Sequence, residues 1–255
     1  MTDSLRSIGT GIGDVDRLAN RVIETLCNRQ IKTETGVRKF VMDYLLQAIQ
    51  NAHDFHPAEV LFELHGYRLS PDDVIDTYVP CAARVLGEKW ISDELGFAQV
   101  TIGALRLQSL LGVASAESMA QHYAHQSEYT ALVAVLEGEQ HFLGAHVAAA
   151  QLRRLGVAVS LSLCEDEKTL LTKVELDQPD MVLLSCARIE ALDAISRTVK
   201  KIRAAKVTAP VLALGGALKT EEAGTRQKTG VDIVTNTARD VLGFCAKRKQ
   251  ALIGK

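Results

Sequence analysis

The stretch T130-A-L-V-A-V-L-E-G-E-Q-H-F-L-G144 decides the fold. An apolar run of strand length, 131–136, ends abruptly in a polar segment that carries Glu139, His141 and Gly144. In an open sheet of parallel strands, ligands bind just outside the carboxyl ends of the strands. A histidine with a carboxylate two residues before it is therefore a candidate ligand at such an edge.

The sequence after this stretch alternates between short apolar runs and helical patterns. Strands are expected at 130–136, 157–163, 181–184, 211–214 and 232–235, and helices near 146–155, 166–176, 189–205 and 238–250. Alternation at these lengths is typical of a parallel sheet with helices on both faces. We expect a flavodoxin-like, doubly wound domain with five strands.

The sequence before it predicts helices only. Apolar residues recur at helical spacing from residue 36 to about 119. The motif S70-P-D-D73 predicts a helix start, because a hydroxyl cap precedes a proline and two acids, and Gly87 is expected to end that helix. A second long helix is expected from Glu94 to Met119, apolar on more than one face. A bundle of about four helices follows from this pattern.

These patterns divide the chain into four parts. Residues 1–35 are expected to form a leader with one amphipathic helix, 36–120 the helical bundle, 121–129 a polar linker and 130–255 the α/β domain.

Composition excludes several classes of protein. The chain has 255 residues, is 47% apolar and has a net charge of −2, which favours a globular protein without a basic nucleic-acid-binding face. Its five cysteines are scattered and unpaired in sequence, as in a reduced, cytoplasmic protein. We find no signal peptide and no apolar run of membrane-spanning length, so no membrane association is expected.

Three signals lie at the ends of successive strands. Glu139, His141 and Gly144 follow the first strand, Ser185 the third, and Gly215 and Gly216 the fourth. The intervals between the signals are 40 residues (145–184) and 27 residues (188–214). Imidazole is a good ligand for late first-row metals, and Glu139, directly or relayed through Ser185, could orient it. Glycines let the backbone approach a bulky ligand, although a glycine pair alone could also be a simple turn.

This pattern resembles the cobalamin-binding module of methionine synthase, corrinoid mutases and cobalamin photoreceptors, whose signature is D-x-H-x-x-G, S-x-L and G-G. The resemblance implies that His141 is the lower axial cobalt ligand and that Glu139 takes the aspartate position. Ser185, Gly215 and Gly216 would lie beside the slot for the displaced nucleotide tail, and Gly144 matches the glycine of the first motif. Two positions depart from the signature: Glu139 is one methylene longer, and Ala187 replaces the leucine.

The upper side of the corrin is less well defined. In the resemblance the bundle caps this side, and Trp90, the only tryptophan, is the candidate cap, with a buried bundle anchor as its alternative role. Adenosylcobalamin photoreceptors have Glu-His nine residues after this tryptophan, whereas Val100 and Thr101 stand here. Aquo- or hydroxocobalamin is therefore favoured, with upper-ligand candidates at His53, His56 and His65.

The overall layout is similar to the AerR/PpaA family of cobalamin-binding antirepressors of photosynthesis genes. The resemblance implies a non-enzymatic, light-responsive regulator without its own DNA-binding domain, which contacts a repressor of the CrtJ/PpsR type. Two alternatives stay open. The first is a corrinoid carrier that shuttles methyl groups between methyltransferases. The second is a sensor in which His141 binds haem, although haem has no nucleotide tail to fill the slot.

Overall fold

The computed structural model describes residues 36–51, 54–121, 128–205, 209–216 and 222–253. The chain divides into two compact units, Met1–Phe55 and His56–Lys255. The first unit contains α2 (Lys39–Asn51). The helix expected within the leader, 1–35, lies outside the described residues, as does His53. Most of the expected linker does too, so the four-part domain organisation stays a prediction.

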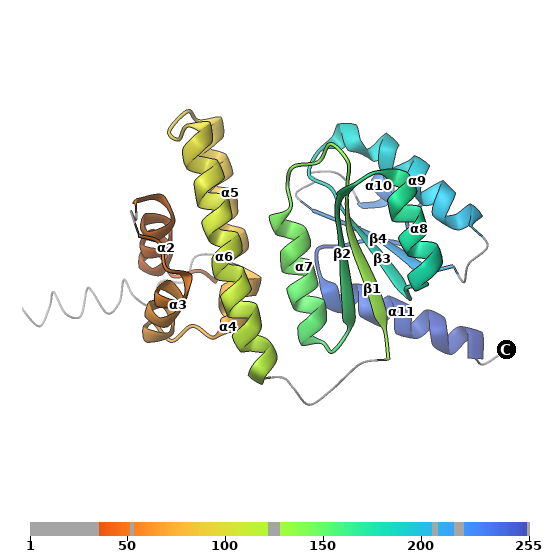
Figure 1. Cartoon of the computed structure of the whole chain (residues 1–255), viewed down its shortest axis with the longest axis horizontal. Coiled ribbons are helices and arrows are strands. Elements are labelled where there is room, and N and C mark those ends of the chain that lie inside the picture. The colour runs from red at the N-terminus through yellow and green to blue at the C-terminus, as the bar shows by residue number, and fades with distance from the viewer. Residues whose placement is uncertain (1–35, 52–53, 122–127, 206–208, 217–221, 254–255) are drawn as a thin grey trace, which may run out of the picture. The chain divides into compact units, whose positions relative to one another are not determined.

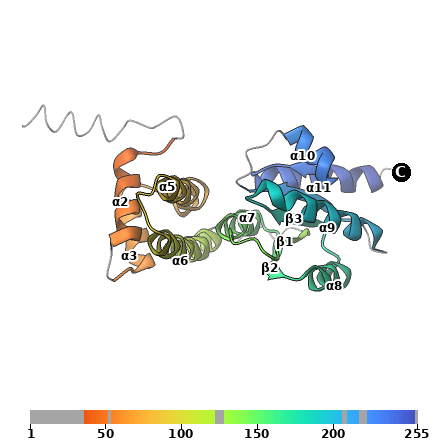
Figure 2. The same cartoon turned by 90° about the horizontal axis from the view of Figure 1, so that it is seen from above.

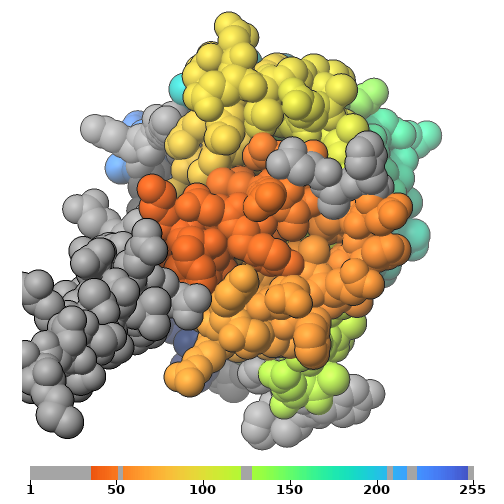
Figure 3. Space-filling view, turned by 90° about the vertical axis from the view of Figure 1, so that its left-hand side faces the viewer, coloured from red at the N-terminus to blue at the C-terminus, as the bar shows by residue number. Residues whose placement is uncertain are grey.

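The second unit begins with a group of helices. They are α3 (Pro57–Gly66), α4 (Pro71–Asp73), a π-helical turn η1 (Val74–Tyr78), α5 (Val79–Ile91) and α6 (Phe97–Gln121). Figure 3 shows the outer surface of α3 in orange and of α5 in yellow. Gly103 of α6 packs so closely on α5 that a Cβ there would lie 2.9 Å from a methyl group of Leu86. Within this unit, the helices predicted from the sequence are therefore present, and α5 and α6 pack on each other.

The predicted helix start at Ser70 is confirmed. The Ser70 hydroxyl accepts a hydrogen bond from the Asp73 amide at 3.1 Å, and the Asp73 carboxylate accepts one from the Ser70 amide at 2.9 Å. The predicted end at Gly87 is wrong, because the helix continues to Ile91. One interior glycine costs about 1 kcal/mol, which packing can offset. The helix ends where Asp93 adopts a left-handed conformation with φ +59°.

The next helix begins later than expected, at Phe97 instead of Glu94, because residues 92–96 form the turn. By length and composition alone, α6 could cross a membrane, which the sequence reading did not anticipate. It packs against α3, α4, α5 and α7, and it buries Leu107 and Leu110 completely. A single helix of this kind is weak evidence for a membrane protein, and 28% of its apolar window is buried.

The rest of the second unit is a five-stranded parallel sheet. Its strands are β1 (Thr130–Leu136), β2 (Ala158–Glu165), β3 (Met181–Ser185), β4 (Val211–Gly215) and β5 (Ile233–Val234), in the order β2-β1-β3-β4-β5. The helices between and after them are α7 (Leu143–Arg154), α8 (Glu167–Asp177), η2 (Ile189–Ala191), α9 (Leu192–Ala204), α10 (Glu222–Thr229) and α11 (Ala238–Ile253). This is the doubly wound fold that the sequence predicts, and α10 is an additional helix.

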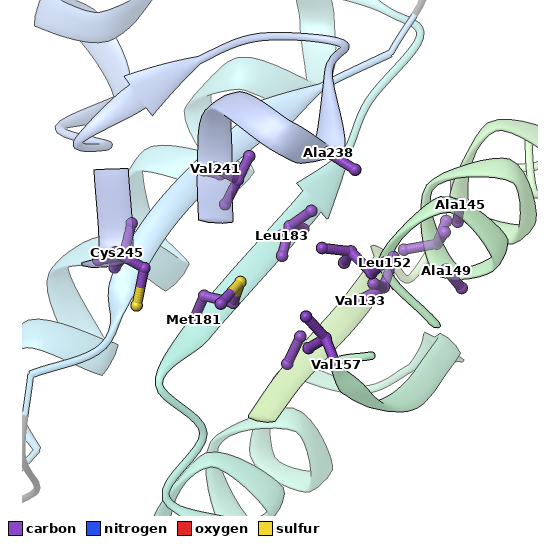
Figure 4. Close-up of a cluster of buried hydrophobic side chains, with 14 residues drawn as sticks. Val133, Ala145, Ala149, Leu152, Val157, Met181, Leu183, Ala238, Val241 and Cys245 are labelled. Atoms are coloured by element: carbon purple, nitrogen blue, oxygen red, sulfur yellow. The ribbon is translucent and has the colours of Figure 1, made fainter. Parts of the chain in front are cut away.

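Helices cover both faces of the sheet, with α7 and α11 on one face and α8 and α9 on the other (Figures 1 and 2). On the first face, Val133 and Leu183 point toward Leu152 of α7 and Val241 of α11 (Figure 4). The central strands are buried on both faces, which explains their uninterrupted apolar runs. The chain reverses its direction of winding between β1 and β3, so the predicted site lies at this switch point.

Candidate functional site

His141 lies in the loop between β1 and α7, and Glu139 holds its imidazole directly. One carboxylate oxygen of Glu139 contacts His141 Nδ1 and also accepts hydrogen bonds from the amides of Gln140 (2.9 Å) and His141 (3.2 Å). The other oxygen accepts from the Ala187 amide at 3.1 Å. The bond to His141 needs no relay through Ser185, which the sequence had left open.

This arrangement leaves the other imidazole nitrogen available. The His141 side chain is 60% exposed, whereas the Glu139 side chain is only 4% exposed. No described residue hydrogen-bonds to His141 Nε2. A carboxylate bound to Nδ1 fixes the tautomer with the lone pair on Nε2, which is the form that binds a metal. The site is therefore built to present one oriented nitrogen donor.

Hydrogen bonds keep Glu139 charged in this buried position. Burial by itself raises the pKa of Glu139, but the bonds from His141, Ala187 and Gln140 outweigh that effect, and the pKa is lowered overall.

The loop that carries Glu139 and His141 is also hydrogen-bonded to residues at the ends of both neighbouring strands. The Cys164 thiol at the end of β2 donates to the Glu139 carbonyl at 3.0 Å, and the Arg188 guanidinium beyond β3 donates to the Gly138 carbonyl at 2.8 Å.

The remaining predicted residues form a strip without bulky side chains, which we call the glycine–serine strip: Gly144, Ser185, Gly215 and Gly216. Gly144 lies in the first turn of α7 and not in the loop before the helix, where the sequence had placed it. A Cβ at this position would lie 3.7 Å from Ser185 Oγ. Ser185 is the register partner of Gly215 in the parallel pairing of β3 with β4. No described residue hydrogen-bonds to the Ser185 hydroxyl. The strip thus offers backbone and one hydroxyl group to a ligand.

The two glycines at the end of β4 are also required by the fold itself. A Cβ on Gly216, which has φ +129°, would lie 2.0 Å from the Cys186 carbonyl oxygen, and one on Gly215 would lie 2.7 Å from the Thr235 carbonyl oxygen. Sequence analysis missed the residue that holds them. Asn236, two residues after β5, accepts from the Gly216 amide at 2.7 Å and donates to the Gly216 carbonyl at 3.1 Å. Its position just past a strand end was the signal available.

Residues of α5 and α6 provide an apolar surface near this edge. Gln108 of α6 contacts His146 in α7 at 2.9 Å, and Ser118 near the end of α6 bonds to Asp72, to which Arg154 at the end of α7 also pairs. The two helices therefore run in the same direction, and the first turns of α6 extend past the start of α7. These first turns of α6 carry two exposed apolar side chains, Phe97 (70% exposed) and Leu105 (59% exposed), on the same side of the helix as Gln108.

Trp90 lies in the last turn of α5 and is 49% exposed, so it is not a buried anchor of the bundle. Its role as a cap stays a prediction. Of the histidines considered as upper ligands, His56 precedes α3, and His65 is 3.6 Å from Glu117 on α6. The roles of the predicted site residues toward a cofactor likewise stay predictions.

Comparisons with known proteins show what the chain as a whole is similar to. The model of the B12 binding domain family matches residues 129–243. An uncharacterized 20.5 kDa protein in the bchF–crtJ intergenic region of Rhodobacter capsulatus is 32% identical over 179 residues, covering 70% of this chain and 93% of the relative. Among solved structures, the monomethylamine corrinoid protein of Methanosarcina barkeri has the same fold. Its TM-score is 0.68 at 16% identity, and the match covers 83% of this chain and 99% of that one.

Proposed function

Because this chain belongs to the family of B12-binding domain proteins, we propose that it is a cobalamin-dependent, light-responsive regulator of transcription. The observation that carries the cofactor assignment is the Glu139–His141 pair, which leaves an exposed, oriented Nε2 at the switch point of the sheet. His141 would ligate cobalt from below. Glu139 would hold the imidazole in a fixed orientation and tautomer, and the glycine–serine strip would accept the nucleotide tail.

The residues present fit this cofactor. A ligand bound through His141 meets only backbone and the Ser185 hydroxyl along the glycine–serine strip, so a bulky group can approach the sheet edge. Exposed Trp90, Phe97 and Leu105 offer apolar surface for the upper face of a corrin ring. Cobalamin would supply a cobalt centre whose upper ligand is exchangeable and light-sensitive. The hydroxo or aquo form is the one we propose.

The regulatory part of the proposal rests on the relative in Rhodobacter capsulatus. That relative is encoded between bchF and crtJ, in a photosynthesis gene cluster, and the match covers 93% of its length. We infer that this chain acts in the cytoplasm by protein contact with a repressor of the CrtJ/PpsR type. A ligand can switch such a contact only if it binds the two conformations with different affinity.

The experiment that tests the cofactor is a visible spectrum. Purified protein is mixed in the dark with hydroxocobalamin and desalted, beside a His141→Ala variant. We expect retained corrin bands, shifted from those of the free vitamin in the wild type and lost or altered in the variant. A wild-type protein that retains no corrinoid would refute the assignment, and the same procedure with haemin would then test the haem alternative.

The second candidate function is a corrinoid carrier of a methyltransferase system, since the Methanosarcina protein shares the fold. The two functions are separated by loading the protein with hydroxocobalamin and measuring its binding to the purified repressor in the dark and after illumination. Light-dependent binding supports the regulator. Turnover of bound methylcobalamin by a methyltransferase, without repressor binding, supports the carrier.

A further inference from the structure

Asn236 completes the edge of the sheet beyond the last strand. Strand β5 has only two residues, and the chain leaves it at Thr235. The Asn236 carboxamide then makes two hydrogen bonds to one peptide unit, accepting from the Gly216 amide and donating to the Gly216 carbonyl. A side-chain amide has the same donor and acceptor pair as a backbone peptide, so Asn236 extends the ladder from β5 to β4 by one position.

This bond pair fixes the part of the glycine–serine strip farthest from His141. The Gly215 carbonyl accepts from the Cys186 amide at 2.9 Å, so the ends of β3 and β4 are joined there. Gly216 packs its backbone on the Cys186 carbonyl in a conformation that only glycine adopts freely. The Gly216 peptide is therefore held from two sides, by Cys186 after the end of β3 and by Asn236 after the end of β5.

The nucleotide tail of cobalamin is the part of the cofactor that would contact this rigid peptide. When a histidine takes the lower position on cobalt, the nucleotide tail leaves the metal and has to lie against the protein on the same side of the ring. The strip begins at Gly144, three residues after His141, and passes through Ser185 to Gly216. A tail along it would meet the Gly216 peptide, whose position Asn236 sets.

We propose that Asn236 is a positioning residue that gives the protein its preference for corrinoids with a complete nucleotide tail. This inference rests on the proposed function, because it requires His141 to bind cobalt. Asn236 contacts Gly216 and not the metal-ligating loop. It therefore affects recognition of the tail and leaves the His141–cobalt bond unchanged.

The test compares two corrinoids that differ only at the lower side. Hydroxocobalamin carries the nucleotide tail, whereas diaquocobinamide lacks it, and both keep the corrin ring and cobalt. Dissociation constants are measured in the dark by spectrophotometric titration of wild type, Asn236→Ala and Asn236→Asp. We expect Asn236→Ala to weaken cobalamin binding about 10-fold, the scale of one lost hydrogen bond to the tail, and to change cobinamide binding less than about 2-fold.

Asn236→Asp can still accept from the Gly216 amide but cannot donate to its carbonyl, so we expect an intermediate loss. It also preserves the test if the alanine variant does not fold. Thr235→Val is the matched control, because it removes a hydroxyl of the same segment, which donates to Asp240 and accepts from the Thr237 amide, and keeps both hydrogen bonds between Asn236 and Gly216. We expect it to bind both corrinoids as the wild type does.

The outcomes separate the two proposals. Equal weakening for both corrinoids, or no weakening for either, in folded Asn236 variants overturns the role of Asn236 and leaves the cobalamin assignment in place. A wild-type protein that binds neither corrinoid overturns the cobalamin assignment itself.

Discussion

At the scale of single residues, the site depends on a buried charge. Glu139 is 3% exposed and still accepts four hydrogen bonds, including the one from the His141 ring. Because both of its oxygens are occupied by fixed donors, the carboxylate cannot rotate, and neither can the imidazole that it holds. The extra methylene of glutamate relative to aspartate thus allows direct contact with Nδ1 and with the amide of Ala187.

The glycines that resemble the family signature have two different physical roles. In Gly216→Ala, the new Cβ would collide with the Cys186 carbonyl at 2.0 Å in a left-handed backbone. We expect a loss of at least about 3 kcal/mol in the free energy of unfolding. In Gly144→Ala, the Cβ would have ordinary contact with Ser185 at 3.7 Å, and a helical alanine is favourable.

Urea denaturation of both variants measures this difference. Gly144→Ala should remain as stable as the wild type, within about 1 kcal/mol, and should bind hydroxocobalamin more weakly because the methyl group occupies the glycine–serine strip. A Gly216→Ala variant of wild-type stability would show that the end of β4 is not held as described.

At the scale of elements, α7 is the link between the sheet and the helices before it. Arg154, 11% exposed, pairs with Asp72 at 2.9 Å and Asp76 at 2.6 Å. Burial alone would lower the pKa of Arg154, but Asp76 and Asp72 outweigh it and raise the pKa. His146, two turns earlier in α7, makes the other polar contact with α6 through Gln108. Since α7 begins two residues after His141, the loop of the proposed metal site leads directly into the helix that carries this interface.

The contact at His146 predicts a dependence of stability on pH. Gln108 can only donate from its amide nitrogen, so His146 accepts at Nε2 and is neutral. Burial, with a smaller contribution from the charge of Arg153, lowers the pKa of His146 below 6.5. The unfolded chain therefore binds more protons between the two pKa values, and stability rises with pH in that range.

We expect the wild type to lose about 0.5–1 kcal/mol more than His146→Gln as pH falls from about 7.5 to about 5.5. Urea denaturation of both proteins at each pH measures the difference. Identical pH profiles for the two proteins would mean that His146 is protonated in the folded state as easily as in the unfolded chain. Measuring the difference removes the contribution of the other histidines.

The sequence predicted the elements better than their ends. Strand–helix alternation and the Ser70 cap were sufficient for the fold and for one helix start, because these signals are local. The end of α5 depended on Asp93 adopting a left-handed conformation, which tertiary packing decides. Similarly, the contact between His141 and Glu139 joins residues two apart and could be expected from spacing, whereas the position of Asn236 after a strand did not reveal that its partner is Gly216, 20 residues away.

At the scale of the whole molecule, the two halves of the proposed site come from distant parts of the chain. The lower half is the loop after β1 with the ends of β3 and β4, and the upper half would be the exposed apolar residues of α5 and α6. The contacts of α7 with α6 place these helices in the same compact unit as the sheet.

Trp90 makes this arrangement measurable, because it is the only tryptophan in the chain and is 49% exposed. Corrins absorb where tryptophan emits, so a corrin beneath Trp90 would quench its fluorescence strongly by energy transfer. We expect hydroxocobalamin to quench the wild type in proportion to site occupancy and to leave His141→Ala unquenched at the same concentration. Trp90→Phe supplies the background signal. If a protein that retains cobalamin on desalting shows undiminished Trp90 emission, the end of α5 is not the cap of the corrin, and the upper half of the site must be sought elsewhere.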